Sequence, residues 1–116
     1  MASQSSHLSI RIDLPSGQRF GPGKAALLRA LHEAGSIRAA AETLGMSYPR
    51  ALKLIEQMNS SFRTPLVETQ HGGSSGGGAF VTLLGDNVLS LYEDICMAAN
   101  RQNTTALTKI MALLAE

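Results

Sequence analysis

Residues 35–62 read GSIRAAAETLGMSYPRALKLIEQMNSSF, and this stretch predicts two short helices joined by a tight turn. Ser36 is placed to cap the first helix, because a serine hydroxyl can accept a hydrogen bond from a free amide one turn further on. Gly45 follows that helix, and glycine tolerates the left-handed conformation that ends a helix. Ser47 is the next cap, and Pro49 falls in the first turn of the second helix, where a missing amide costs little.

The second helix separates its side chains into two faces. Four apolar residues are spaced 4, 3 and 4 apart and form one edge: Ala51, Ile55, Met58 and Phe62. At ~100° per residue, four polar residues point roughly the other way: Arg50, Lys53, Gln57 and Ser60. Small residues at 39–41 let the second helix cross the first closely. A DNA major groove can accept such a helix, and the alternative is an ordinary helical hairpin with a solvated polar face.

Length and composition indicate one folded domain. A chain of 116 residues, 44% apolar and nearly balanced in charge, is long enough for one modest core. It has no run of ~18 apolar residues, and the opening MASQSSHLSI is no signal peptide, so we expect a soluble cytoplasmic protein. The single Cys96 excludes an internal disulfide and a multi-cysteine metal site, and no cofactor is expected.

Charge is distributed unevenly along the chain. Residues 1–65 carry eight basic and four acidic side chains, a net charge of +4. Residues 66–116 carry two basic and five acidic side chains, a net charge of −3. The basic half contains the helix pair, which favours a nucleic-acid face at one end of the protein and a different role at the other.

The residues before the helix pair predict a strand, a return strand and a helix. Residues 1–7 are polar and are expected to be flexible. Residues 8–14 alternate apolar and polar side chains and predict a half-buried strand, which residues 19–20 continue as a short return strand. A helix is expected from the Gly21-Pro22-Gly23 break to about Ala34, with Leu27, Leu28, Leu31 and Ala34 on its apolar side. Lys24 and Arg29 lie off that side and are expected to face water rather than phosphate.

A glycine-rich segment separates two predicted strands. Residues 66–70 and 79–83 have strand patterns, and HGGSSGGG at residues 71–78 joins them. One interpretation is a wing beside the second helix, whose bare amides can approach a sugar-phosphate backbone. A nucleotide phosphate cradle is a second interpretation, but it lacks the closing Gly-Lys-Ser/Thr and the strand-to-helix context. A plain mobile loop is the third.

The last third of the chain predicts two helices. Thr82 caps a long helix in which five apolar residues are spaced 4, 3, 4 and 3 apart: Leu84, Val88, Leu91, Ile95 and Ala98. Part of this seam must cover the domain's own core, and the remainder, with Tyr92, is available to a second copy. Asn103 interrupts the register, and residues 104–115 predict a second amphipathic helix that must dock on its own domain or on a partner.

Together these features resemble the N-terminal DNA-binding domain of ModE-type molybdate-responsive regulators. The resemblance covers about residues 8–100 and is carried by Gly35-Ser36-Ile37, Ala40-Ala41, Met46-Ser47-Tyr48, Met58-Asn59, Pro65-Leu66-Val67-Glu68, Gly72-Gly73, Gly76-Gly77-Gly78-Ala79, Thr82, Gly85 and Tyr92. The helix pair alone also resembles LysR-type regulators, which lack this glycine-rich wing.

The resemblance implies a winged helix-turn-helix, mainly α with small β, that dimerises through its first and last helices and binds a palindromic operator. We expect a flexible N-terminus at residues 1–7, the winged domain at 8–83, and helices for dimerisation and packing at 84–116. The chain ends at Glu116, so the C-terminal oxyanion-binding modules of the full-length family are expected to be missing and molybdate binding is not expected. Pro49, Leu52 and Ser74-Ser75 depart from residues common in relatives, which removes possible DNA or packing contacts.

The predicted function is a dimeric, sequence-specific transcription regulator that binds double-stranded DNA. Ser47, Tyr48, Arg50, Lys53 and Gln57 are the candidates for the groove, with Arg50 suited to guanine and Gln57 to adenine. The phosphate candidates are Arg38, Arg63 and the wing glycines Gly72, Gly73, Gly76, Gly77 and Gly78. The dimer candidates are Leu84, Val88, Leu91, Tyr92, Ile95 and Ala98. A winged helix that binds protein instead of DNA is the alternative; an enzyme is not expected, because His7, His32 and His71 are scattered without a nucleophile or carboxylate pair.

Overall fold

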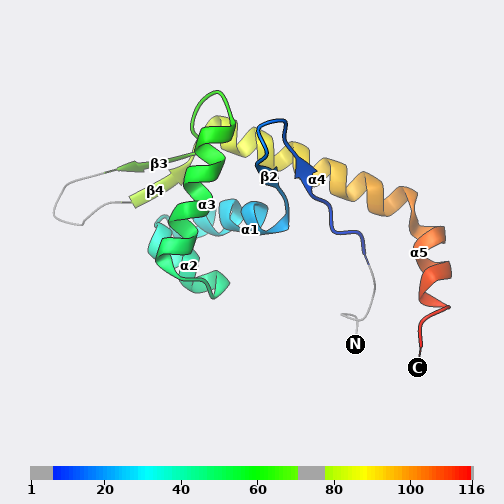
Figure 1. The fold of residues 1–116 in the computed structure, drawn as a ribbon. Helices are drawn as coiled ribbons and strands as arrows, with labels where there is room; N and C mark the ends of the chain where they lie inside the picture. Colours follow the sequence, from blue (N-terminus) through cyan, green and yellow to red (C-terminus); the bar gives the residue numbers. More distant parts are fainter. Residues whose placement is uncertain (1–6, 71–77, 116) are drawn as a thin grey trace.

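The computed structural model describes residues 7–70 and 78–115 and contains five helices and two small antiparallel sheets in this part of the chain (Figure 1). The elements are β1 (Ile12–Asp13), β2 (Arg19–Phe20), α1 (Pro22–Ala34), α2 (Ile37–Leu44), α3 (Tyr48–Ser61), β3 (Val67–Gln70), β4 (Gly78–Val81), α4 (Leu83–Gln102) and α5 (Thr104–Met111). β1 pairs with β2, and β3 pairs with β4 in a register that sets Val67 opposite Val81. A helix-turn-helix followed by a β-hairpin is a winged helix, as the sequence predicts.

The core lies where α1, α2 and α3 meet. Leu27, Leu28 and Leu31 on α1 are buried, whereas Ala34, which we expected on the same side, is exposed. Alanines permit the close helix crossing, because Ala40 of α2 and Ala51 of α3 are fully buried.

The apolar edge of α3 faces this core, as the spacing predicts. Ala51, Ile55 and Met58 are buried. Phe62, which follows the helix, is half-buried and meets Phe20 edge to face, with the ring centroids 6.4 Å apart. The apolar stripe therefore fixes which face of α3 remains open to solvent.

The predicted strand over residues 8–14 is much shorter in the structure. Apolar and polar side chains do alternate between half-buried and exposed, but only Ile12–Asp13 pairs as a strand, because β2 itself has only two residues. The preceding segment bonds to α4 instead: the Tyr92 hydroxyl donates to the Ile10 carbonyl over 2.6 Å, and the Leu8 amide donates to Asn100 Oδ1 over 2.7 Å.

The buried face of α4 differs from the predicted seam. Gly85, Leu89 and Tyr92 are the buried residues of this helix, so Tyr92 belongs to the chain's own core and the expectation that it is available to a second copy is wrong. Two exposed ion pairs join α4 to α1: Arg29 Nε with Glu93 Oε2 and His32 Nε2 with Asp86 Oδ1, each 2.7 Å long. Arg29 thus faces a carboxylate at the surface.

The molecule is elongated, with principal extents of 57 × 33 × 21 Å. Figure 1 shows α4 running along the body and continuing past it, after which α5 turns away. The helix α5 ends at Met111 rather than near residue 115. None of its residues is buried, so the expectation that it docks on its own domain is wrong. Among the described residues no helix is both long enough and apolar enough to span a membrane.

Candidate nucleic-acid interface

Side-chain caps set the bounds of the two helices that present the candidate interface. Ser36 Oγ accepts from the Ala39 amide over 3.1 Å, and Ser47 Oγ accepts from the Arg50 amide over 3.2 Å. Gly45 ends α2 with a φ of 68°, in the left-handed region that favours glycine. The caps that the sequence predicts are therefore present, and they hold the start of α3 in a defined position against α2.

The exposed face of α3 carries the predicted cations. Arg50 and Lys53 are exposed, as are Ser47 and Tyr48 at the start of the helix. Within the described part of the chain, neither Arg50 nor Lys53 forms an ion pair, so both charges remain available. Gln57 is half-buried, two turns along the helix from Arg50.

Arg38 and Tyr48 join the starts of α2 and α3. The Arg38 guanidinium carbon lies over the Tyr48 ring, 5.0 Å from its centroid, which is cation–π geometry. Beside this pair is an open hollow of about 270 Å³ between the helices and the base of the wing, lined by Ser36, Ile37, Arg38, Tyr48, Thr69, Gln70, Gly78 and Ala79.

We use the term wing for β3, residues 71–77 and β4, and its first strand is fastened to α3 by Asn59. Asn59 Oδ1 accepts from the amides of Leu66 (2.8 Å) and Val67 (3.1 Å), and Asn59 Nδ2 donates to the Val67 carbonyl over 3.0 Å. The side-chain amide of Asn59 thus makes hydrogen bonds to the backbone of this segment of the kind that a neighbouring strand would make. Sequence analysis assigns Asn59 no role beyond the resemblance; the signal that could have identified it is an asparagine near a helix end, a few residues before Pro65-Leu66-Val67.

The second strand of the wing is fastened at two other points. The Ala79 amide donates to the Gly35 carbonyl over 2.9 Å, which ties β4 to the corner between α1 and α2. After β4, the Thr82 hydroxyl donates to the Pro65 carbonyl over 2.7 Å and accepts from the Gly85 amide over 3.1 Å. The base of the wing is therefore fixed relative to α3.

Of the remaining residues that are predicted to contact phosphate, two belong to the described part of the chain and four do not. Arg63 is exposed just after α3, and Gly78 lies in β4, where an added Cβ would approach the Gly35 carbonyl oxygen at 3.2 Å. Gly72, Gly73, Gly76 and Gly77 lie outside the described residues.

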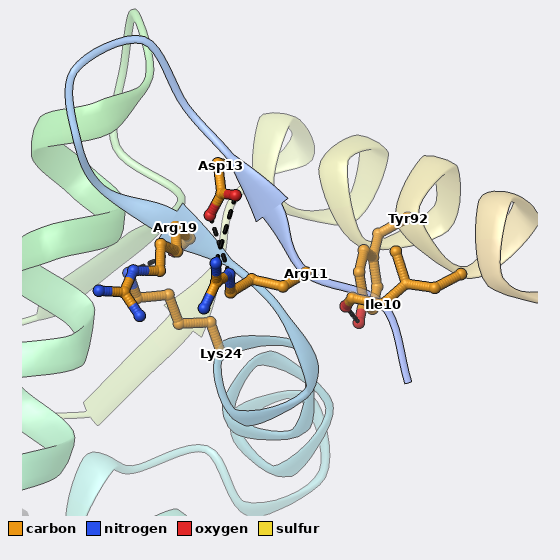
Figure 2. Close-up of polar contacts among 6 residues, drawn as sticks. All are labelled: Ile10, Arg11, Asp13, Arg19, Lys24 and Tyr92. Atoms are coloured by element: carbon orange, nitrogen blue, oxygen red, sulfur yellow. Dashed lines mark hydrogen bonds and ion pairs between the residues drawn. The ribbon is translucent and has the colours of Figure 1, made fainter. Parts of the chain in front are cut away.

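Lys24 is not at the water-facing position that we expected. Only 8% of it is exposed, and its Nζ donates to the Arg19 carbonyl over 2.6 Å. Burial, followed by the charge of Arg19, lowers the pKa of Lys24. Figure 2 shows the two side chains lying side by side beneath the β1–β2 turn. The helical pattern could not predict this contact, because its acceptor belongs to β2.

The comparison with protein families identifies the chain. A family model described as bacterial regulatory helix-turn-helix protein, lysR family, matches residues 24–83, just over half of the chain. The chain belongs to this family. The matched region runs from α1 through the wing to the start of α4, so it contains the whole candidate interface.

The relatives of this LysR-family chain confirm the resemblance to ModE. It is 39% identical over 77 residues to the molybdenum-pterin-binding protein MopB of Rhodobacter capsulatus, covering 66% of the chain and 28% of MopB. It is 39% identical over 72 residues to the transcriptional regulator ModE of Yersinia pestis, covering 62% of the chain and 27% of that protein. The chain therefore spans less than a third of the length of either relative.

A solved structure gives the same fold. The DNA-binding domain of CbnR, crystallised in complex with DNA, superposes with a TM-score of 0.57 at 22% identity, covering 76% of this chain and 95% of that one. The matched family and the ModE relatives are regulators rather than enzymes.

The α4 surface of this LysR-family chain carries most of the predicted dimer residues. Leu91 and Ile95 are 63% and 47% exposed, and Leu84, Val88 and Ala98 are half-buried. The seam therefore lies at the flank of the helix, beside the buried face that contains Tyr92. An exposed apolar flank of this kind is open to a partner helix.

Proposed function

We propose that this chain binds double-stranded DNA as the DNA-binding part of a transcription regulator, with the first half of α3 in the major groove. The observation that carries the proposal is the division of α3: Ala51, Ile55 and Met58 are buried while Arg50 and Lys53 remain exposed without an ion pair among the described residues. A helix held this way presents its cations to base edges without losing core contacts.

Each predicted contact has a distinct role. Arg50 is assigned to a guanine, because its planar guanidinium can donate two hydrogen bonds to O6 and N7 of that base. Arg38, Arg63 and the wing are assigned to phosphates, which fix the register of the protein on the duplex without reading sequence. The hollow between Arg38, Tyr48 and the wing base supports this assignment, since a sugar-phosphate strand can enter it.

We further propose that the chain acts as a dimer on a palindromic operator. The exposed apolar flank of α4 supports this, because Leu91 and Ile95 remain largely uncovered by the described part of their own domain. A two-fold dimer would contact half-sites about one helical turn (~10 bp), or a multiple of it, apart.

Selection of bound DNA from a random pool, followed by fluorescence polarisation on the selected sites, tests the proposal. We expect an enriched palindromic motif and an affinity that falls steeply between two salt concentrations, because phosphate contacts release counterions. Absence of binding to any DNA at low salt would contradict the proposal and would favour a protein-binding role for the winged helix.

Arg50→Ala tests the assigned base contact. We expect a loss of ~1–3 kcal/mol of binding free energy on the selected site and relaxed preference at one base position. Arg101→Ala, which removes an exposed charge from the last turn of α4, is the matched control and should leave the preference unchanged. An equal loss for Arg50→Ala on every DNA sequence would exclude Arg50 as a base reader.

A further inference from the structure

A second hollow lies on a different flank of α3, away from the wing base. It has a volume of about 260 Å³ and is lined by Gly17, Gln18, Arg19, Lys24 and Gln57. These residues come from the β1–β2 turn, from α1 and from α3. Tyr48 of α3 lines the first hollow and Gln57 of α3 lines this one, so both hollows border the same helix.

The charges in this hollow are of one sign. Lys24 is 8% exposed as a whole residue, and its ammonium donates a hydrogen bond to the neutral Arg19 carbonyl. The Arg19 side chain is exposed and lies beside it (Figure 2). Among the described residues neither cation forms an ion pair, although Arg11 close by pairs with Asp13 at 2.8 Å. An ammonium and a guanidinium that lie side by side repel each other, and an anion bound between them would relieve that repulsion.

The other lining groups suit a small oxyanion. Gln57 contributes an amide that can donate hydrogen bonds from α3 itself. Gly17 has a φ of 96°, and a Cβ added there would meet no atom within 4 Å among the described residues other than its chain neighbours. A guanidinium and an ammonium supply several charge-assisted donors that a phosphate oxygen can accept.

We propose that this hollow binds a phosphate group, held by Arg19, Lys24 and Gln57. The favoured source is the DNA backbone on the flank of the major groove opposite the wing, and in that form the inference rests on the proposed function. Gln57 then contacts a phosphate and does not read adenine. A free phosphate ion has the same chemistry and is the other source.

The first arm of the test measures DNA binding of the full chain. Arg19→Ala keeps the backbone carbonyl that Lys24 requires, so the fold is expected to persist. We expect a loss of about tenfold that is the same on every DNA sequence, and a salt slope lower by about 1, as for one lost phosphate contact. Arg101→Ala removes one positive charge elsewhere and serves as the control, so it should leave the salt dependence of DNA binding unchanged. Unchanged affinity and slope in Arg19→Ala, with wild type binding DNA, would overturn the DNA form of the inference.

The second arm uses inorganic phosphate alone and is independent of DNA. Melting temperatures are measured with increasing phosphate at constant ionic strength for wild type, Arg101→Ala, Arg19→Ala and Lys24→Met. An increase in wild type and Arg101→Ala that is lost in the other two variants supports the site, because a ligand stabilises only the folded state that binds it. Should wild type fail to bind DNA, this result would still establish the hollow as a phosphate site. The same response in all four proteins, or none, would exclude free phosphate as the ligand.

Discussion

Tyr92 is one of two α4 residues, with Asn100, whose side chains bond to the N-terminal segment. Its hydroxyl donates to the Ile10 carbonyl over 2.6 Å, and its ring meets Phe20 edge to face at 5.1 Å between centroids. Burial, with a hydrogen bond to the Cys96 thiol, raises the pKa of Tyr92 to about 12. The neutral phenol is therefore part of the folded state.

Tyr92→Phe is expected to lower the free energy of unfolding by ~1–2 kcal/mol at pH 8, because the Ile10 carbonyl loses its donor. The pH dependence follows from a folded-state pKa above the unfolded value of 10.0. The contribution of this raised pKa to the free energy of unfolding, at most ~3 kcal/mol, is fully present below pH 10 and is lost as pH rises to about 12.

Urea unfolding between pH 8 and 11 measures both effects. The lowered pKa of Lys24 acts in the opposite direction, since the unfolded state then binds more protons below pH 10.5, but it is common to both proteins and cancels in the comparison. Identical pH dependence in wild type and Tyr92→Phe would show that the hydroxyl does not titrate differently on unfolding.

The role of a single residue can be predicted from sequence where its hydrogen-bond partner lies close by in the chain. The Ser36, Ser47 and Thr82 caps each bond to an amide three residues along the chain, so a short window of sequence contains both partners. Lys24 and Tyr92 were misplaced because their acceptors belong to other elements, the β2 carbonyl of Arg19 and the N-terminal carbonyl of Ile10.

The helix that follows the wing packs closely against its base at Gly85. An ideal Cβ on Gly85 of α4 would lie 2.4 Å from the Leu66 carbonyl oxygen and 2.7 Å from Val81 Cγ1. Only glycine allows the start of α4 to lie this close to β3 and β4. The contact determines where α4 begins relative to the interface.

Gly85→Ala is therefore expected to cost ~1–3 kcal/mol of stability, because backbone must shift to relieve the clash. Gly23→Ala is the matched control: its Cβ would meet nothing within 4 Å, and alanine is the better helix former, so stability should stay the same or rise by up to ~1 kcal/mol. Denaturant midpoints for both variants check this. Equal midpoints would mean that α4 adjusts freely at this contact.

Sequence predicts the ends of the helices better than it predicts the length of the strands or the buried face of α4. The bounds of α1, α2 and α3 follow from glycine, proline and serine at their ends. The strand over residues 8–14 was too long, because alternation reports half-burial but does not supply a pairing partner. On α4, Leu84 and Val88 of the predicted seam pack against the core, as part of the seam was expected to, but the fully buried residues Gly85, Leu89 and Tyr92 lie beside the seam. Gly85 is buried by a close approach and Tyr92 makes a hydrogen bond, and apolar spacing reports neither.

At the scale of the whole molecule, α4 extends past the body (Figure 1), and some of its apolar side chains are exposed. Leu91 and Ile95 lie on its flank, and α5 beyond it has no buried residue. The proposed dimer would cover the flank of α4. The candidate interface on α3 lies on a separate part of the fold and would remain free.

Leu91→Lys with Ile95→Lys is expected to convert the dimer into a monomer. Each fully buried side chain contributes ~1.5–3 kcal/mol, so the dimer Kd should rise by at least ~100-fold. Sedimentation measures the change against the chain mass of 12.3 kDa. Ser90→Lys, an exposed polar position on the same helix, should remain dimeric. A wild-type chain that sediments as a monomer at DNA-binding concentrations would argue against this dimer.

Both ends of the wing are fixed by groups outside residues 71–77: Asn59 holds β3, and the Gly35 carbonyl holds β4. β3 and β4 are therefore each anchored to the helices at a point of their own, so the position of the wing base relative to Arg50 depends on α3 and on the corner between α1 and α2.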